Sequence, residues 1–213
     1  MDKIYSIIDY GAGNILSVQR ALNYCNFRTK LVSSPKEIQN ASYLVLPGDG
    51  SFKFASESLN KLQITDKILS HVKKGKPLIG ICLGMQFLMS SSEEHGLSKG
   101  LSIIEGKVRK IKVKNNYINK VPVVGWNYTF FKNNSEKKFN KLNSVISKKN
   151  FYYVHSFSAE PKNKKEILAY YKYANRKIVS IVAKDNVIGF QFHPEKSGKN
   201  GLNLIKKINT LGL

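Results

Sequence analysis

Cys82 lies between two glycines in a segment whose spacing suits a nucleophile. Residues 80–84 read GICLG and end a short apolar run. Glycines on either side allow a sharp turn from a strand into a helix, which projects the central side chain beyond the carboxyl edge of a sheet. The helix N-terminus favours a thiolate, and nearby backbone N–H groups can hold a developing oxyanion. Taken alone, the pentapeptide fits a nucleophilic cysteine and a buried structural thiol equally well.

His193 and Glu195 form a second chemical pair, in the segment QFHPE at residues 191–195. A cysteine nucleophile needs a base, and the base needs a carboxylate that orients it. Pro194 limits the local freedom of the chain, so both side chains can point into one site. A lone His-Pro-Glu is most often a loop. Together with the cysteine segment it predicts a triad of Cys82, His193 and Glu195.

Short apolar runs alternate with amphipathic segments in the first half of the chain and predict the elements that position this triad. The expected strands cover residues 4–8, 30–32, 43–46 and 77–81. The expected helices cover residues 14–25, 64–73 and 82–89. Alternating strands and helices with buried strand runs predict a parallel sheet covered on both faces.

The second half of the chain is predicted to form strands connected by hairpin turns. Strands are expected at residues 108–113, 151–154, 178–183 and 187–192, with Asp185 and Asn186 in the turn between the last two. Lysine- and asparagine-rich stretches at 114–120, 132–143 and 160–166 predict surface loops, and residues 201–208 a final helix. No linker or repeat divides the chain, which predicts a single domain over residues 1–213.

Composition bounds the class of protein. The chain has 213 residues and is 42% hydrophobic, which is typical of a globular domain. It contains no run of about 20 apolar residues and no signal-peptide pattern, so we expect a cytoplasmic protein without a membrane partner. The two cysteines, Cys25 and Cys82, are too few for a disulfide scaffold and show no metal-ligand spacing. No metal site is expected.

The charge is strongly positive, with 35 basic against 14 acidic residues and a net charge of +21. Such a balance indicates either a nucleic-acid or acidic-membrane partner or a biased composition. The lysines are scattered and accompany no recognition motif, which favours composition. We expect no nucleic-acid partner.

Motifs along the chain resemble a known family. GICLGMQ at 80–86 with QFHPE at 191–195 resembles the class I (triad) glutamine amidotransferases. Further blocks are similar to the glutaminase subunits of imidazole glycerol phosphate synthase: IDYGAGN at 8–14, LPGDGSF at 46–52, VPVVGWN at 121–127, YVHS at 153–156 and HPEKS at 193–197. The resemblance implies an α/β, flavodoxin-like fold with a mostly parallel central sheet, helices on both faces and a smaller antiparallel β element in the second half.

The resemblance also implies roles for individual residues. Cys82 would attack the side-chain amide of glutamine, while His193 moves protons and Glu195 fixes its tautomer; no cofactor is implied. The other implied roles are the oxyanion hole (Gly48, Asp49, Leu83), glutamine binding (Gln86, Glu94, His155, Ser156) and the partner interface or ammonia tunnel (Asn14, Trp126, Tyr152, Lys196). Taken singly, Trp126 also fits a core aromatic and Lys196 a solvated lysine.

The implied partner is a (β/α)8-barrel synthase in a heterodimer, which receives ammonia through a tunnel and forms imidazole glycerol phosphate and AICAR in histidine biosynthesis. Two positions depart from the family pattern. Asp49 stands where valine is usual, and Val123-Val124 stands where His-Met is usual. These departures leave open a paralogous barrel that supplies ammonia for acetamidino sugars of surface glycans. A catalytically idle scaffold is the third alternative.

Overall fold

The computed structural model describes residues 3–113, 120–132 and 136–213. The strands within these ranges are β1 (Ile4–Ile8), β2 (Arg28–Val32), β3 (Tyr43–Leu46), β4 (Leu78–Ile81), β5 (Ser91–Ser92), β6 (Ser98–Lys99), β7 (Gly106–Lys110), β8 (Val123–Phe131), β9 (Lys149–His155), β10 (Phe157–Pro161), β11 (Ile167–Tyr173), β12 (Arg176–Lys184) and β13 (Val187–Phe190). The helices are α1 (Ile15–Tyr24), α2 (Pro35–Asn40), α3 (Phe52–Lys61), α4 (Thr65–Lys73), α5 (Leu83–Phe87), α6 (Lys137–Asn140), α7 (Asn143–Ile146) and α8 (Gly198–Ile208), with 3-10 turns η1 (Lys164–Glu166) and η2 (Pro194–Lys196).

Nine of the described strands form one sheet in the order β2-β1-β3-β4-β13-β12-β11-β8-β9. Pairing is parallel from β2 to β13 and antiparallel from β13 to β9. Strand β13 therefore lies where the two kinds of pairing meet. A smaller sheet has the order β10-β7-β5-β6.

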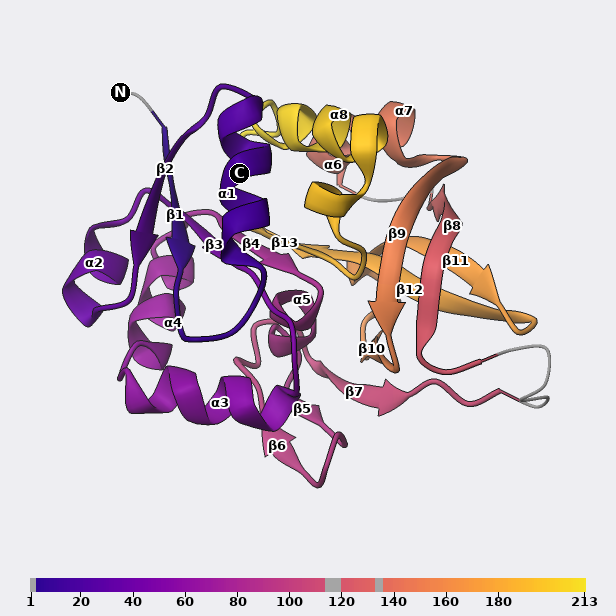
Figure 1. Ribbon diagram of the computed structural model, residues 1–213, viewed down its shortest axis with the longest axis horizontal. Helices are drawn as coiled ribbons and strands as arrows, with labels where there is room; N and C mark the ends of the chain where they lie inside the picture. Colours follow the sequence, from indigo (N-terminus) through magenta and orange to yellow (C-terminus); the bar gives the residue numbers. More distant parts are fainter. Residues whose placement is uncertain (1–2, 114–119, 133–135) are drawn as a thin grey trace.

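Helices cover both faces of the parallel part (Figure 1), with α1 and α8 on one side and α2, α3 and α4 on the other. Successive residues of the central strands alternate between two hydrophobic cores. Ile7 and Val45 pack with α1 and α8, whereas Ile8 and Leu46 pack with α2, α3 and α4. Burial on both faces explains why these strands read as continuous apolar runs rather than as alternating patterns.

Side-chain caps define where several helices begin. The Asn14 side chain accepts a hydrogen bond from Ser17 N at the start of α1. Ser34 and Glu37 form a reciprocal capping box on α2, and Ser51 caps α3. Each cap satisfies backbone N–H groups that have no partner inside the helix.

The α/β class and the parallel sheet between two helical layers are confirmed. Strands β1 and β3 have the predicted bounds, and the hairpin at Asp185 joins β12 to β13. The antiparallel strands of the second half, however, extend the central sheet itself and make it only partly parallel. Helices α2 and α3 and strands β8, β10 and β11 have no counterpart among the predicted elements.

Several predicted bounds were wrong. Strand β7 ends at Lys110 and β13 at Phe190, although Ile111 N and Gln191 N each still donate one hydrogen bond to a neighbouring segment of the chain. The loop predicted at 132–143 contains α6, where Phe139 is buried, and the loop at 160–166 contains the end of β10 and then η1. Most of the loop predicted at 114–120 lies outside the described residues.

No helix among the described residues is long and apolar enough to cross a membrane.

Candidate active site

Residues 80–84, here called the elbow, connect β4 to α5. Cys82 has φ 53° and ψ −109°, a backbone conformation that is strained for a residue with a side chain. Neither flanking glycine has room for a Cβ atom: at Gly80 it would lie 2.7 Å from Gly84 O, and at Gly84 it would lie 1.9 Å from Leu46 O. The predicted strand-to-helix turn is present, and its glycines are required by close backbone packing.

The segment at residues 47–52 passes directly over the elbow. A Cβ atom on Gly48 would lie 2.5 Å from Leu83 Cβ and 2.7 Å from Gly84 N, so the two backbones are in contact. The Tyr10 hydroxyl donates a hydrogen bond of 2.7 Å to Pro47 O and fixes the start of this segment. Gly48 and Leu83, both predicted for the oxyanion hole, are therefore neighbours.

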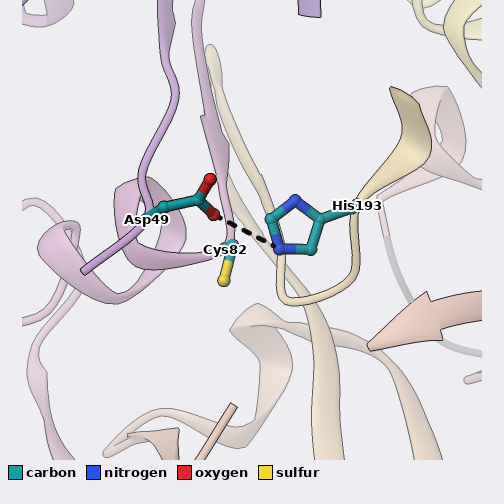
Figure 2. A group of neighbouring side chains, drawn as sticks. All are labelled: Asp49, Cys82 and His193. Carbon is teal, nitrogen blue, oxygen red and sulfur yellow. Dashed lines mark ion pairs between the residues drawn. The ribbon is translucent and has the colours of Figure 1, made fainter. Parts of the chain in front are cut away.

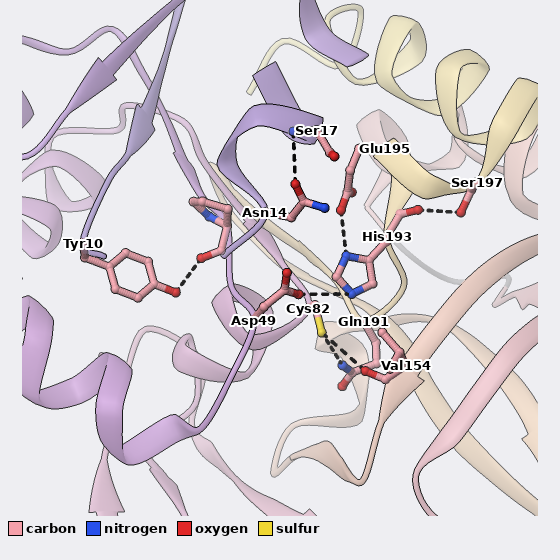
Figure 3. A network of polar contacts seen from close by, with 11 residues as sticks. Tyr10, Asn14, Ser17, Asp49, Cys82, Val154, Gln191, His193, Glu195 and Ser197 are labelled. Carbon is pink, nitrogen blue, oxygen red and sulfur yellow. Dashed lines mark hydrogen bonds and ion pairs between the residues drawn. The ribbon is translucent and has the colours of Figure 1, made fainter. Parts of the chain in front are cut away.

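Residues 191–197, here called the histidine turn, follow β13, the strand that pairs with β4. His193 Nδ1 lies 2.7 Å from Glu195 Oε1, and both side chains are 2% exposed. Ser197 Oγ donates to His193 O at 2.6 Å and accepts from Tyr152 N at 3.0 Å. Figure 3 shows the contacts of His193 with Glu195 and with Ser197. The predicted pairing of His193 with Glu195 is present.

Cys82 and His193, predicted as nucleophile and base, come together across the β4–β13 pair. The sulfur of Cys82, a ring nitrogen of His193 and a carboxylate oxygen of Asp49 all lie within 4.8 Å of one another. Burial opposes protonation of His193, but contacts with Cys82 and Glu195 outweigh it and raise the pKa of the imidazole to about 10. This environment favours the protonated form of the His193 imidazole.

A cavity of about 320 Å³ opens beside the sulfur of Cys82. A cavity of this size suits a small polar molecule. Besides Cys82, its lining includes most of the residues predicted for the oxyanion hole and for glutamine binding, together with one residue predicted for the partner interface: Asp49, Leu83, Gln86, Glu94, His155, Ser156 and Lys196. The structure thus places residues from four separate sequence blocks around one space.

Several of these side chains already have partners within the protein. Gln86 Nε2 donates to Phe157 O at 2.9 Å and to Gln191 Oε1 at 3.1 Å. One oxygen of Glu94 accepts from Phe52 N at 2.8 Å, at the start of α3. Gln86 and Glu94 therefore also brace the walls of the cavity.

His155 is held on both ring nitrogens. Nδ1 lies 2.7 Å from Phe157 O and Nε2 lies 2.8 Å from Tyr171 OH. Burial lowers the pKa of His155 to about 4, with His193 adding to the effect and the carbonyl of Phe157 opposing it. A neutral His155 forms part of the cavity wall.

The residues predicted for the partner interface lie in different settings. Trp126 is 54% exposed on β8, with its ring 6.0 Å from the ring of Tyr152 in an edge-on arrangement. Lys196 lines the cavity, and Asn14 caps α1. Trp126 is thus a surface aromatic, which excludes the core role that its residue type also allowed.

Four residues near the site have no role in the sequence-based prediction. Tyr10 and Ser197 hold the backbone, as described above. Gln191 Nε2 lies 3.9 Å from Cys82 Sγ, and Val154 O lies 4.0 Å from the same atom. All four residues belong to the matching blocks, and their position relative to Cys82 and His193 was the missing signal.

The glutamine amidotransferase class-I family model matches residues 6–208. The chain is 40% identical to imidazole glycerol phosphate synthase subunit HisH 1 of Legionella pneumophila (strain Lens), over 95% of this chain and 96% of that protein. It is also 40% identical to subunit HisH of Caldanaerobacter subterraneus subsp. tengcongensis, over 96% and 97% of the two chains. A crystal structure described as a glutamine amidotransferase shares the fold, with a TM-score of 0.72, 16% identity and 98% and 99% coverage.

Proposed function

Because this chain belongs to the class-I glutamine amidotransferase family, and within it to the HisH subunits of imidazole glycerol phosphate synthase, we propose that it hydrolyses glutamine and delivers the ammonia to a synthase partner. The observation that carries this proposal is the cavity beside Cys82. A nucleophile and polar side chains for a small amide substrate line the cavity. A base with its own carboxylate adjoins the nucleophile.

The reaction divides into two halves. The Cys82 thiolate attacks the side-chain amide carbon of glutamine, and the negative charge of the tetrahedral intermediate is carried by the former carbonyl oxygen. His193 protonates the departing nitrogen, so the C–N bond breaks and ammonia and a glutamyl thioester result. His193 then takes a proton from water, the water oxygen attacks the thioester, and glutamate leaves as the thiolate is restored. Glu195, 2.7 Å from Nδ1, keeps the ring oriented with Nε2 toward the sulfur.

The backbone supports the charged intermediate. Leu83 begins α5, so its N–H has no acceptor within the helix and lies beside the nucleophile. The 47–52 segment contacts the elbow at Gly48 and supplies backbone amides on the other side. A rotation of the peptide between Gly48 and Asp49 would switch this second donor on and off. Such a switch would couple glutamine hydrolysis to partner docking.

The partner surface is proposed on the exposed face of β8. Val124, Trp126 and Tyr128 are 60%, 54% and 58% exposed and occupy alternate positions, so they lie on one side of the strand. Trp126 contacts Tyr152, whose backbone bonds the histidine turn through His193 N. An apolar surface that continues to the catalytic base suits a partner that receives ammonia before it meets bulk water, where protonation would end its nucleophilicity. A (β/α)8-barrel synthase in a heterodimer is the partner that we propose.

The test is a glutaminase assay of the purified chain with the barrel synthase, with and without the ligand of the barrel. We expect glutamate release to rise at least about 100-fold when barrel and ligand are present. A diazo-ketone analogue of glutamine should then label Cys82, and Cys82→Ala should abolish both labelling and turnover. Absence of turnover and labelling in the complete complex would show that the chain is an idle scaffold.

A second acceptor is tested in the same experiment. Asp49 lies beside His193, at a position where the family usually has valine. Val124 is exposed and belongs to the Val123-Val124 pair, which stands where His-Met is usual. Parallel assays with a histidine-pathway barrel and with a glycan-pathway barrel compare the two. We expect the histidine-pathway barrel to stimulate glutamine hydrolysis. Stimulation by the glycan-pathway barrel alone would assign the ammonia to sugar amidation.

A further inference from the structure

His193 faces two carboxylates, one on each ring nitrogen. Glu195 Oε1 lies 2.7 Å from Nδ1, whereas Asp49 Oδ1 lies 3.7 Å from Nε2, too far for a hydrogen bond. Nε2 is buried and has no hydrogen-bond partner among the described residues. The His193 side chain is 2% exposed, so this unpartnered nitrogen points into the space beside Cys82 rather than into solvent.

The three groups around this space are zinc ligands by type. Figure 2 shows the carboxylate of Asp49 facing the imidazole of His193, with the sulfur of Cys82 beside them. Their ligand atoms all lie within 4.8 Å of one another. A tetrahedral zinc ion with bonds of about 2.0–2.3 Å holds its ligand atoms roughly 3.3–3.6 Å apart. The 3.7 Å between His193 Nε2 and Asp49 Oδ1 is already close to that spacing.

Glu195 supplies a further feature of metal sites. A histidine that binds a metal commonly donates its other ring N–H to a carboxylate, which orients the ring and strengthens it as a ligand. The 2.7 Å contact between Nδ1 and Glu195 has this arrangement. The cavity lining within the described residues also contains two carboxylates, Asp49 and Glu94, against one ammonium group, Lys196.

We propose that Asp49, Cys82 and His193 form a zinc site whose occupation reversibly blocks the nucleophile. Zinc binding releases to solvent the protons carried by the Cys82 sulfur and by His193 Nε2, with no change of oxidation state, and the fourth position of the ion faces the cavity. Asp49 is decisive because a valine at this position would leave only sulfur and nitrogen as ligands. The inference adds an inhibitory metal site to the proposed glutaminase and is tested without glutamine.

Direct binding to the purified full-length chain tests the site. We expect one zinc ion per chain by equilibrium dialysis, and affinity at least about 10-fold lower in Asp49→Asn. Asp185→Asn removes a carboxylate from an exposed turn remote from the site and should bind as the wild type does. Cobalt in place of zinc should show the absorption of a tetrahedral ion with a thiolate-to-metal charge-transfer band, and Cys82→Ser should lose that band.

Protection of the thiol gives a second readout that needs no variant. Zinc should slow alkylation of Cys82 by iodoacetamide at least about 10-fold and leave the reaction of Cys25 unchanged. Equal affinity of Asp49→Asn and wild type, a cobalt complex without the charge-transfer band, or unprotected Cys82 at saturating zinc would each overturn the inference. A wild-type chain that binds zinc yet hydrolyses no glutamine with its partner would overturn the proposed function alone.

Discussion

The elbow at residues 80–84 is positioned by backbone packing, whereas the histidine turn at residues 191–197 is positioned by hydrogen bonds. Around Cys82, glycines let three stretches of main chain approach so closely that a single Cβ atom would clash. Around His193, the hydroxyl of Ser197 and the carboxylate of Glu195 hold the chain and the ring. Cys82 is thus positioned by glycines, whose missing side chains allow close backbone packing. His193 is positioned by the polar side chains of Ser197 and Glu195.

The difference has a functional reason. A nucleophile must project at a strained backbone angle, and only backbone contacts on several sides hold such an angle against relaxation. A base must keep one ring orientation while its charge changes, and hydrogen bonds to both the ring and its backbone provide this. Substitutions should therefore affect the two segments through different observables.

The largest expected effect is loss of turnover when either segment loses its reacting group. Cys82→Ala and His193→Ala should each lower kcat/KM at least about 10⁴-fold, and the double variant about as much as either single one. The two residues act in the same steps, so removing the second leaves little more to lose. The measurement is steady-state glutaminase activity in the partner complex. Additive losses would show that the two segments contribute independently.

Crowding at the elbow should produce the next largest effect, on stability. Gly84→Ala places a Cβ atom 1.9 Å from the backbone oxygen of Leu46, and we expect a loss of about 3 kcal/mol in the free energy of unfolding. Gly189→Ala is the matched control on β13, where the new atom meets the Met85 side chain at 2.7 Å. The contacts there, which include Leu88 Cδ1 at 2.9 Å, are with side-chain atoms and not with backbone, so a smaller loss of about 1–2 kcal/mol is expected. Urea denaturation compares the two, and equal losses would contradict the backbone-packing account.

Protonation of His71 at acid pH should lower the stability of the protein next to β4, the strand that leads into the elbow. Its Nε2 lies 3.0 Å from Pro77 O, next to the start of β4. Burial lowers the pKa of His71 to about 4, the carbonyl of Pro77 opposes this, and Lys76 reinforces it. The folded-state pKa is below the unfolded value of about 6.5, so this contribution to stability is complete above pH 6.5 and is lost as the pH falls toward 4.

The expected loss from His71 between pH 7 and pH 4 is on the order of 2–3 kcal/mol. His155 titrates in the same direction, so the measurement is the difference between wild type and His71→Gln in urea denaturation across this range. His71→Gln should show a shallower decline of stability. His95→Asn, at an exposed position, serves as the control and should follow the wild type.

The smallest effect is expected at the histidine turn. Ser197→Ala leaves His193 O and Tyr152 N without the hydroxyl that bonds both, at a cost of about 1–2 kcal/mol in unfolding free energy. Turnover should fall about 10-fold with little change in KM, because the base shifts while the cavity wall stays. Ser144→Ala, at an exposed position of α7, is the control. Unchanged turnover would show that Glu195 alone positions the ring.

The sequence by itself determined the central elements of the fold and the chemistry. Strands β1 and β3 were predicted with their observed bounds, because strands buried on both faces leave unbroken apolar runs. Cys82, His193 and Glu195 were predicted from local spacing. The residues that form the elbow, and those that pair the histidine with its carboxylate, lie within a few positions of one another in the sequence. Strand β8 was missed, because its exposed apolar side chains break the alternation of buried and polar positions.

Only the tertiary structure decided how the separate segments meet. Pairing of β4 with β13 brings residues more than a hundred positions apart to one edge of the sheet, and no local pattern encodes that pairing. Contact of Gly48 with the elbow then places Asp49 beside His193 Nε2. The sequence marked Asp49 as a departure from its family. The fold places its carboxylate 3.7 Å from His193 Nε2, where it is the third ligand of the proposed zinc site. The sequence alone could not show this, because the chemistry of a side chain depends on neighbours that only folding supplies.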